Sequence, residues 1–517
     1  MPRFKPYSYD QTKLIPIDFT RQLQPGTFEF ALNHIVDEMD LSVFHHRFRN
    51  DETGAPAYDP AVLLKIVLFA YSRGITSSRE IERACRENVV FMALSADTKP
   101  HFTTIAGFVS SMESEITPLF LNVLGICAEE GLIGGKMFAV DGCKISSNCS
   151  KEWSGTRADF ERKKEKLQKS IRLLLRKHKD TDDDDEGPGP GMRQKESEAL
   201  ERLRAKANKF EKWLETNEDK KGSKGNVKQS NITDNESAKM PCSHGVIQGY
   251  NGLAAVDSKH QVIVAAEAYG EGQEKALLKP MLDGIRKNFS GLGETRDVLS
   301  DAVLVADNGY HSEENVRMVM EEGIEAYLAD NKFRKRDPTF AASDRHKRPI
   351  DRHKTKPGPR WFPPRDFIFD ESKGKLICPA GKELYVKNRN YKGTDGHRGI
   401  SYMAKKTDCR VCGLRHKCLR KADTEARQVV IFTGEGADGR RTYTQRMIEK
   451  FDTPLGRFLY SRRMGVAEPV FADITHALRL KWFSLRGKVK VNIQWKLFTI
   501  VHNIMKILRY GPRFAYG

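Results

Sequence analysis

Two aspartates follow apolar runs that have the composition of buried strands. The run from Met137 to Val140 leads to Asp141, and the run from Ala302 to Ala306 leads to Asp307. A carboxylate at the end of a buried strand is costly unless it is paired or binds a cation. If the two strands lie side by side, their carboxylates can share one or two divalent cations, because Mg²⁺ prefers oxygen ligands.

A third acidic residue, Glu468, precedes Pro469 at what we expect to be the start of a helix. Apolar residues from Val470 to Leu478 would pack this helix on the sheet, so Glu468 could supply a third carboxylate. Arg462 and Arg463, about one turn earlier, would then face phosphates. A glutamate at a helix N-terminus can equally be a complement to the helix dipole, and these residues alone leave both interpretations open.

The charge balance favours a polyanionic partner. The chain has 517 residues, with 87 Lys and Arg against 69 Asp and Glu, a net charge of +18 and a pI near 9.3. Because no apolar stretch of transmembrane length accompanies this charge, nucleic acid is a better candidate than a membrane. The N-terminal residues contain no apolar signal segment, and we expect a cytoplasmic protein without a membrane partner.

Four of the nine cysteines fall in one late cluster, which consists of Cys378, Cys409, Cys412 and Cys418. Their spacing suits a tetrahedral structural Zn²⁺ site in a small ribbon-like module, with His416 as a substitute ligand. Such a site would add folding energy to a segment with little apolar content. The alternative is a set of buried free cysteines.

A basic, proline-rich segment runs from Asn331 to about Trp361. We expect its first cations to contact DNA phosphates, namely Lys332, Arg334, Lys335 and Arg336. A solvated loop without a ligand would have the same composition.

The surrounding elements indicate a mixed α/β fold. Residues 1–130 have helical patterns and could bind DNA or dimerise, and residues 156–220 contain two amphipathic helices that predict a helical hairpin. A β-hairpin over 245–269 is followed by a helix, the strand before Asp307, a second helix and a strand at 325–330. We therefore divide the chain into a helical domain (1–130), a first core segment (131–330), an insertion (331–440) and C-terminal helices (441–517).

These motifs resemble insertion-sequence transposases of the DDE type, in the branch with a helical N-terminal domain and a cysteine-bearing insertion before the glutamate. The resemblance is carried by Pro60–Phe108, Val140–Gly142, Ala306–Tyr310 and Tyr460–Leu478, together with Arg486-Gly487 and His502-Asn503. It implies an RNase H-like mixed sheet core that is interrupted by the helical hairpin and by the zinc-ribbon-like insertion. It also implies that Asp141, Asp307 and Glu468 bind two Mg²⁺ (or Mn²⁺) ions. Tyr460 and Arg463 match the accompanying tyrosine and arginine, and we expect both to contact DNA.

The same resemblance implies metal-dependent cleavage at transposon ends and strand transfer by the freed 3′-OH. The partners would be double-stranded DNA, as terminal repeats and target, and at least one further copy of the chain, with nucleoid association when DNA is bound. Two positions depart from the family pattern. Thr475 stands where a lysine is common, and the arginine lies one position further from the glutamate than usual.

Three other functions are compatible with the residues. A metal-dependent nuclease would cut DNA without joining it, and a transposase-derived regulator would bind DNA without catalysis. A recombinase with a covalent tyrosine could use Tyr310 or Tyr460, but no persuasive set of arginines and histidines surrounds either residue in the sequence.

Overall fold

The structure is a computed structural model. It describes residues 16–47, 56–182, 190–222, 225–242, 245–340, 361–393, 397–421, 423–436 and 439–514. The chain divides into two compact units, which are unit 1 (Met1–Ala302 with Arg463–Gly517) and unit 2 (Val303–Arg462). Both units contain helices and strands, which confirms the predicted mixed α/β class.

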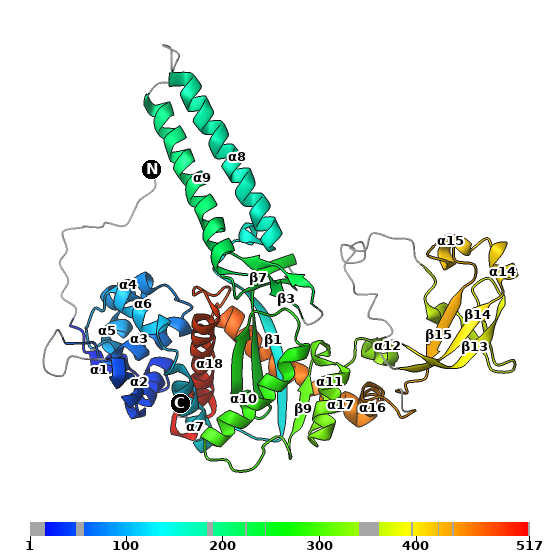
Figure 1. Ribbon diagram of the computed structural model, residues 1–517. Coiled ribbons are helices and arrows are strands. Elements are labelled where there is room, and N and C mark those ends of the chain that lie inside the picture. The colour runs from blue at the N-terminus through cyan, green and yellow to red at the C-terminus, as the bar shows by residue number, and fades with distance from the viewer. Residues whose placement is uncertain are drawn as a thin grey trace, which may run out of the picture. The chain divides into compact units, whose positions relative to one another are not determined.

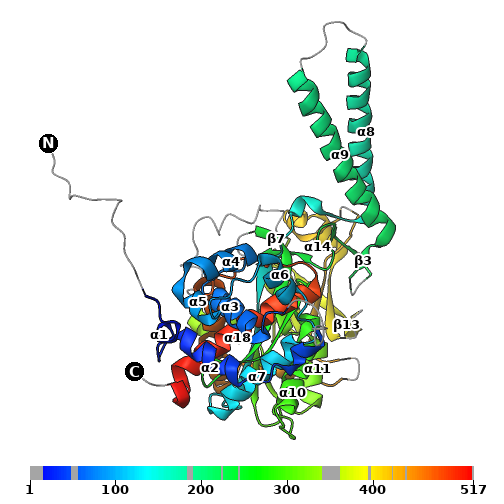
Figure 2. The same cartoon turned by 90° about the vertical axis from the view of Figure 1, so that its left-hand side faces the viewer.

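Unit 1 begins with the predicted helical segment, which packs around the C-terminal helix α18 (Lys488–Tyr510) (Figure 2). The α-helices of this N-terminal segment are α1 (Phe19–Gln22), α2 (Phe28–Glu38), α3 (Pro60–Ser72), α4 (Ser78–Glu87), α5 (Val89–Leu94), α6 (Phe102–Ser110) and α7 (Ile116–Glu129), with a 3₁₀-helix η1 (Ser42–Arg47). Asp59 caps α3 by accepting a hydrogen bond from the Ala61 amide, and Pro60 occupies the first turn. Tyr71 of α3 stacks on Phe498 of α18 with ring centroids 4.9 Å apart.

The sheet of unit 1 is built around the long strand β7 (Gly245–Asp257). β7 pairs antiparallel with β1 (Met137–Ser146), β6 (Ala238–Cys242) and β8 (Ile263–Tyr269). The predicted β-hairpin is confirmed, although its second strand begins at Ile263. The expectation that the first strand ends at Asp141 is wrong, because β1 stays paired with β7 up to Ser146. Gly142 is not a turn residue, since a Cβ atom there would lie 2.3 Å from Leu253 Cδ2 on the facing strand.

Helix α18 packs on β8 and satisfies part of that strand's backbone with two asparagines. Asn503 accepts from the Ile263 amide and donates to the Ile263 carbonyl, each at 2.9 Å. Asn492 makes the same pair of contacts with Ala268, at 2.7 and 3.0 Å. The two amides therefore act as a neighbouring strand would. Helix α10 (Leu278–Gly291) also packs on β8.

Two long helices, α8 (Arg157–Asp182) and α9 (Pro190–Thr216), run side by side as the predicted hairpin (Figure 1). At their base Phe160, Phe210 and Trp213 form a small buried cluster. Short strands lie nearby in the chain, namely β2 (Ser154–Gly155), β3 (Lys220–Lys221), β4 (Val227–Lys228) and β5 (Ser230–Asn231). In the described parts of the chain, no helix combines the length and apolar character needed to cross a bilayer.

Unit 2 begins with the predicted strand, helix and strand. β9 (Val303–Ala306) and β10 (Glu325–Leu328) pair in parallel and are connected by α11 (Glu313–Glu321). Helix α16 (Tyr443–Phe451) packs on α11, where Glu313 accepts from the Tyr443 and Thr444 amides at 2.9 Å. Because these are orphan amides of a helix N-terminus, Glu313 acts as a cap from another element.

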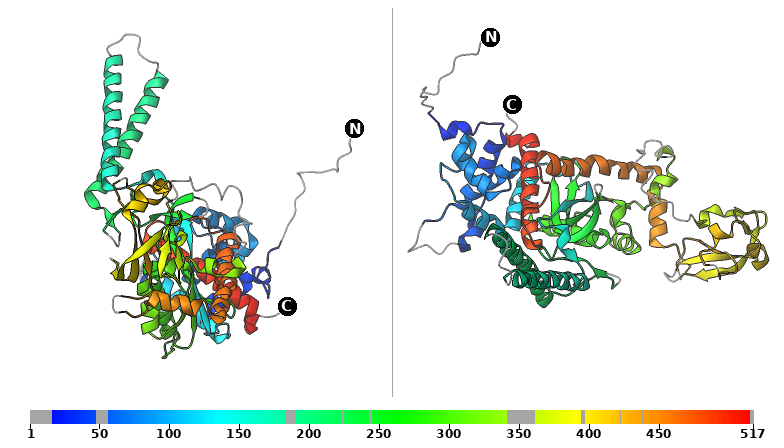
Figure 3. Two further views of the ribbon diagram at one scale, coloured as in Figure 1. Left: turned by 90° about the vertical axis from the view of Figure 1, so that its right-hand side faces the viewer. Right: turned by 90° about the horizontal axis from the view of Figure 1, so that it is seen from above.

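The cysteine-bearing part of unit 2 is an antiparallel sheet with its own core (Figure 3). Its strands are β11 (Ile368–Asp370), β12 (Lys375–Ile377), β13 (Glu383–Lys392), β14 (Arg398–Ala404) and β15 (Gln428–Phe432), with helices α14 (Lys406–Arg410) and α15 (Arg415–Cys418). Phe367, Leu376, Leu384, Tyr402 and Val429 are buried between them. The expectation of little apolar content is wrong, because alternate residues of these short strands form a core of this kind.

Helix α17 (Pro454–Ala472) begins in unit 2 and ends in unit 1. The expectation that a helix starts at Glu468 is wrong, because both Glu468 and Pro469 lie inside α17. Pro469 has no N–H to donate to the carbonyl of Gly465, four residues earlier. That carbonyl instead accepts a hydrogen bond of 2.9 Å from Gln261 Nε2. A π-helix, η8 (Asp473–Ala477), follows directly.

Candidate active site

Asp141 of β1 is paired with Arg463 of α17 within unit 1. Arg463 Nη1 donates a short hydrogen bond to Asp141 Oδ2, and the Gly142 amide donates to Asp141 Oδ1 at 2.8 Å. The two side chains are only 16% (Asp141) and 8% (Arg463) exposed. A guanidinium so close compensates the charge of a carboxylate that would otherwise be costly to bury.

Asp307 of unit 2 is in contact with the predicted tyrosine. It follows β9 directly and precedes the 3₁₀-helix η4 (Asn308–Tyr310). Tyr460 Oη donates to Asp307 Oδ1 at 3.2 Å. The Tyr460 ring is held edge-on by Phe333 and Phe451, with centroids 5.3 and 4.9 Å away. The aromatic cluster therefore fixes the direction of the hydroxyl.

Glu468 lies on α17, eight residues after Tyr460, and its side chain is exposed. Among the described residues, no group of three or more His, Cys, Asp or Glu side chains is placed to hold a metal ion. The assignment of Asp141, Asp307 and Glu468 as a metal-binding triad therefore stays a prediction. Arg462 is also exposed, whereas its neighbour Arg463 is buried against Asp141.

Gln261 is a residue near the candidate site that the sequence did not point to. It precedes β8, has φ of +61°, and holds the carbonyl of Gly465, three residues before Glu468. Its own carbonyl lies 3.0 Å from Nε2 of the buried His502, whose Nδ1 contacts Asp473 Oδ2 at 2.6 Å. The second half of α17 is thus fixed by side chains distant in sequence, which no local pattern could reveal.

The predicted DNA-contacting cations differ in their surroundings. Arg336 bridges two aspartates, with Nη2 2.5 Å from Asp330 Oδ1 and Nε 2.5 Å from Asp452 Oδ2. Arg334 lies over the rings of Phe333 and Phe340. Lys332 and Lys335 are exposed. Arg336 therefore has a structural role in unit 2, and only the other three present their charge mainly to solvent. Residues 341–360, which continue the basic segment, lie outside the described residues.

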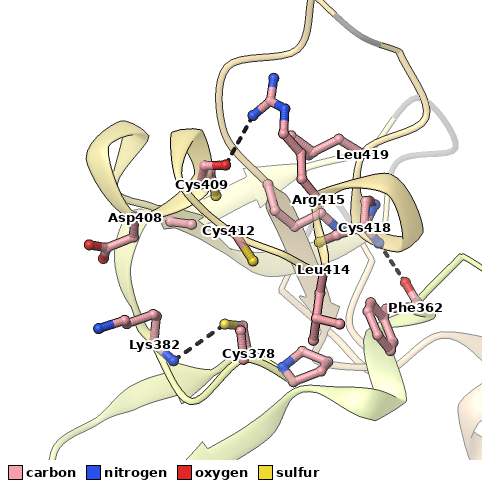
Figure 4. A pocket seen from close by; sticks show the side chains of 14 residues that line it. Phe362, Cys378, Lys382, Asp408, Cys409, Cys412, Leu414, Arg415, Cys418 and Leu419 are labelled. Atoms are coloured by element: carbon pink, nitrogen blue, oxygen red, sulfur yellow. Dashed lines mark hydrogen bonds between the residues drawn. The ribbon is translucent and has the colours of Figure 1, made fainter.

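Cys378, Cys409, Cys412 and Cys418 all line one pocket of the five-stranded module (Figure 4). Its cavity volume of about 30 Å³ has room for a single small ion or a water. His416 is not among the lining residues. Burial raises the pKa of the Cys418 thiol, and the three neighbouring thiols act in the same direction.

The loops that carry these cysteines are held by backbone contacts. The Lys382 amide donates to Cys378 Sγ at 3.3 Å across a turn that contains Gly381 at φ +75°. Arg415 Nη1 donates to the Cys409 carbonyl at 3.2 Å, and Arg427 Nη1 donates to the Cys418 carbonyl at 3.1 Å. Amide donors to sulfur and braced ligand loops are features that favour metal ligation. The number and type of donors thus fit Zn²⁺, although the thiols do not form a group already placed around an ion.

Two family models match parts of the chain. Residues 377–508 match a family model described as a transposase DDE domain, and residues 18–111 match one described as a transposase domain (DUF772). Together the matches support an insertion-sequence DDE transposase. No curated protein matches the chain at a significant level.

The DDE-domain match covers the four clustered cysteines, Tyr460, Arg463 and Glu468, but it begins after Asp141 and Asp307. The second match covers helices α1 to α6. DDE transposases as a family are nucleic-acid-processing enzymes that bind DNA and generally use divalent metals such as Mg²⁺.

Proposed function

We propose that this transposase cleaves DNA at the ends of a mobile element and joins the freed 3′ ends to target DNA. One observation carries the proposal beyond the family matches. Tyr460 and Arg463, the tyrosine and arginine of the resembled motif, each contact one of the two aspartates picked out from the sequence. Each aspartate is thereby held in a defined orientation by a residue of the motif, as preorganised catalytic carboxylates require.

In this proposal Asp141, Asp307 and Glu468 are the ligands of two Mg²⁺ (or Mn²⁺) ions in an RNase H-like core. When bound, such ions neutralise the charge of a phosphodiester and acidify a water molecule. Three oxygen-bearing side chains suit these hard cations. Arg463 compensates the charge of Asp141, and Tyr460 orients the Asp307 carboxylate.

The proposed chemistry proceeds in two displacements at phosphorus. First, a water oxygen bonds to phosphorus while the bond from phosphorus to the 3′ oxygen breaks, and that oxygen takes a proton. The resulting 3′-OH then attacks a target phosphodiester, loses its proton and releases the 3′ oxygen of the target strand. The second step exchanges one phosphodiester for another, so it needs no covalent protein intermediate.

Exposed cations would hold the DNA strands during these steps. We assign Arg462, Lys332, Arg334 and Lys335 to phosphate contacts, and Arg336 to a supporting role through its aspartate pairs. Two ends must be processed together, so we expect a homodimer or a larger assembly on double-stranded DNA.

The cysteine cluster is proposed to bind one structural Zn²⁺ through Cys378, Cys409, Cys412 and Cys418. Four thiolates close a tetrahedral site and leave no position for a substrate, so this ion would stabilise the module without catalysing a reaction. The shared pocket and the amide donor to Cys378 Sγ support the assignment.

A joining assay tests the proposed function. A labelled DNA fragment that carries one end of the element and its flanking sequence is incubated with the protein, Mg²⁺ and an unlabelled target plasmid. We expect both shortened labelled strands and label covalently joined to the plasmid. Shortened strands without joined label would indicate a nuclease, and binding without either product would indicate a DNA-binding regulator. Products that form without divalent metal and retain covalent protein would indicate a tyrosine recombinase.

A further inference from the structure

A second site in unit 1 lies next to the C-terminal end of β1. An open pocket of about 470 Å³ is bordered by the loop after β1, by α9 and by the segment that precedes α18. Its lining includes two tryptophans, two cations and short polar side chains, among them Trp153, Trp482, Lys209, Arg486, Ser147 and Asn148. Among the described residues, those that line this pocket include no Asp or Glu.

Trp482 offers an unused aromatic surface at this pocket. Its side chain is 57% exposed, which is costly for so large an apolar group. The backbone at Trp482 is nevertheless fixed, because it forms a parallel bridge to Ser146 and the Phe483 amide donates to the Ser146 carbonyl at 2.9 Å. An exposed indole on a fixed backbone is ready to stack without a large loss of entropy.

A buried carboxylate behind the lining residues connects the segments that form the pocket. Asp234 is 3% exposed and accepts a short hydrogen bond from Ser147 Oγ. It also accepts from Tyr250 Oη at 2.7 Å and from the Gly487 amide at 3.2 Å. Asp234 therefore joins the end of β1 to the segment that carries Trp482 and Arg486, so the two walls of the pocket keep a constant separation.

Two cations complete the lining. Arg486 uses Nε to donate to the Asn148 carbonyl at 2.6 Å, a bond that does not engage its terminal nitrogens. Lys209 of α9 is exposed and lies 5.5 Å from the centre of the Trp153 ring. The Trp153 ring itself is stacked on Phe210, with centroids 5.3 Å apart. Trp153 is thus part of the wall, and Trp482 is the surface left for a ligand.

We propose that this pocket binds an unpaired nucleotide of a DNA strand, with its base stacked on Trp482 and its phosphates near Arg486 and Lys209. An exposed aromatic ring with flanking cations and no acid is the combination by which proteins hold single strands. The inference rests on the proposed function, which supplies DNA as the ligand. Ser146 lies five residues after Asp141 on β1, roughly 17 Å along the strand, so the pocket is within reach of DNA held at Asp141.

Binding of single-stranded DNA tests the proposal without requiring cleavage. The probe is a fluorescent oligothymidylate of about 20 nucleotides, and its affinity is compared with that of a duplex of the same length by anisotropy at fixed salt. We expect Trp482→Ala to weaken oligothymidylate binding by roughly 5- to 150-fold, and Trp482→Phe to retain most of the affinity. Duplex binding should change much less. Phe432→Ala, which removes an aromatic side chain of the same exposure (56%) from β15, is the matched control.

The cations give a second readout. Lys209→Gln should reduce the slope of log K against log salt concentration for the single strand by about 0.7, the value for one lost phosphate contact. Unchanged unfolding temperatures would show that the variants fold. Wild-type affinity of Trp482→Ala for oligothymidylate would overturn the proposal, as would an equal loss for duplex and single strand. Should Asp141→Asn still cleave DNA, the proposed function fails while these binding results still decide the pocket.

Discussion

Arg463 donates from Nη1 to Oδ2 of Asp141, and both side chains are largely buried. The pair joins a strand residue to a helix residue that is 322 positions away in the sequence. Neither charge can be moved out of water alone without a large cost, so the two residues stabilise unit 1 only as a pair.

The pair predicts strong coupling in a double-mutant cycle. Arg463→Met should lower the free energy of unfolding by about 3–5 kcal/mol, because it leaves the Asp141 carboxylate buried without its counter-charge. Asp141→Asn in the same chain should restore part of the loss, with a coupling energy of about 0.5–3 kcal/mol. Denaturant unfolding measures both. The neighbouring exposed Arg462→Met is the control and should change stability by less than about 0.5 kcal/mol. Additive effects of the two substitutions would contradict a paired role.

The hydrogen bond from Gln261 to the Gly465 carbonyl is expected to stabilise the second half of α17. Gln261→Ala removes the hydrogen bond to the Gly465 carbonyl that Pro469 cannot supply, and should cost about 0.5–1.5 kcal/mol of unfolding free energy. Gln261→Gly also removes the amide but relieves the positive φ of +61°, so it should be less destabilising than alanine by about 1 kcal/mol. Denaturant unfolding of both variants checks the order. A glycine variant less stable than the alanine variant would show that φ is not strained at this position.

A fall in pH should lower the stability of unit 2, because Asp330 becomes protonated. Burial alone would raise the pKa of Asp330, but the hydrogen bonds and charge of Arg336 outweigh it, and the pKa lies below its usual value. The Asp330 carboxylate therefore binds a proton more readily in the unfolded chain than in the folded protein. The stabilisation is present above the unfolded pKa of about 3.9 and is lost as the pH falls through the lower pKa of the folded state. Thermal unfolding between about pH 6 and pH 2 should show this loss.

Arg336→Met should remove that loss of stability in acid, because burial of Asp330 is then no longer outweighed by the guanidinium and the folded-state pKa is no longer held below the unfolded value by that charge. Arg334→Met leaves the aspartate pairs in place and serves as the control. An unchanged profile in Arg336→Met would show that other carboxylates cause the acid sensitivity.

The cysteine cluster predicts one bound zinc per chain. Metal analysis of protein produced with zinc should find about one equivalent, and Cys412→Ser should lose most of it because a closed tetrahedral site needs all four thiolates. Cys242→Ser, which alters a cysteine of β6 outside the cluster, should keep the metal. Zinc-free wild-type protein, or equal zinc in both variants, would rule out the site.

Local sequence patterns are sufficient to predict many of the helices and strands. The β-hairpin of β7 and β8 and the strand before Asp307 were predictable, because alternation and apolar runs end there at turn residues. Asp141 was misplaced at a strand end because Asp and Gly disfavour strands, whereas pairing with β7 keeps both extended. The sequence predicts a ribbon-like module around the cysteines but not its five strands or its core, because each strand is short and partly charged and the core forms only when five segments combine.

Residues of the candidate site can be named from sequence motifs, whereas the contacts that hold them cannot. Asp141, Asp307, Tyr460 and Arg463 could be named from motifs, and two contacts among them are present. The sequence around Pro469 predicts a helix start, since nothing near it in sequence shows that Gln261 satisfies the Gly465 carbonyl. The sequence does not single out Trp482, because its exposed position depends on a β-bridge to Ser146, a residue far away in the sequence.

The central claim is that three carboxylates perform metal-dependent cleavage. Its most direct test is the rate of Mg²⁺- or Mn²⁺-dependent nicking of DNA that carries the element's ends, measured for wild type, Asp141→Asn, Asp307→Asn and Glu468→Gln. Glu314→Gln, which neutralises an exposed glutamate of α11, is the control. We predict that each of the first three variants loses about 10³-fold or more in rate while it still binds end DNA, and that the control nicks normally. Nicking at the wild-type rate by any one of the three would contradict the claim.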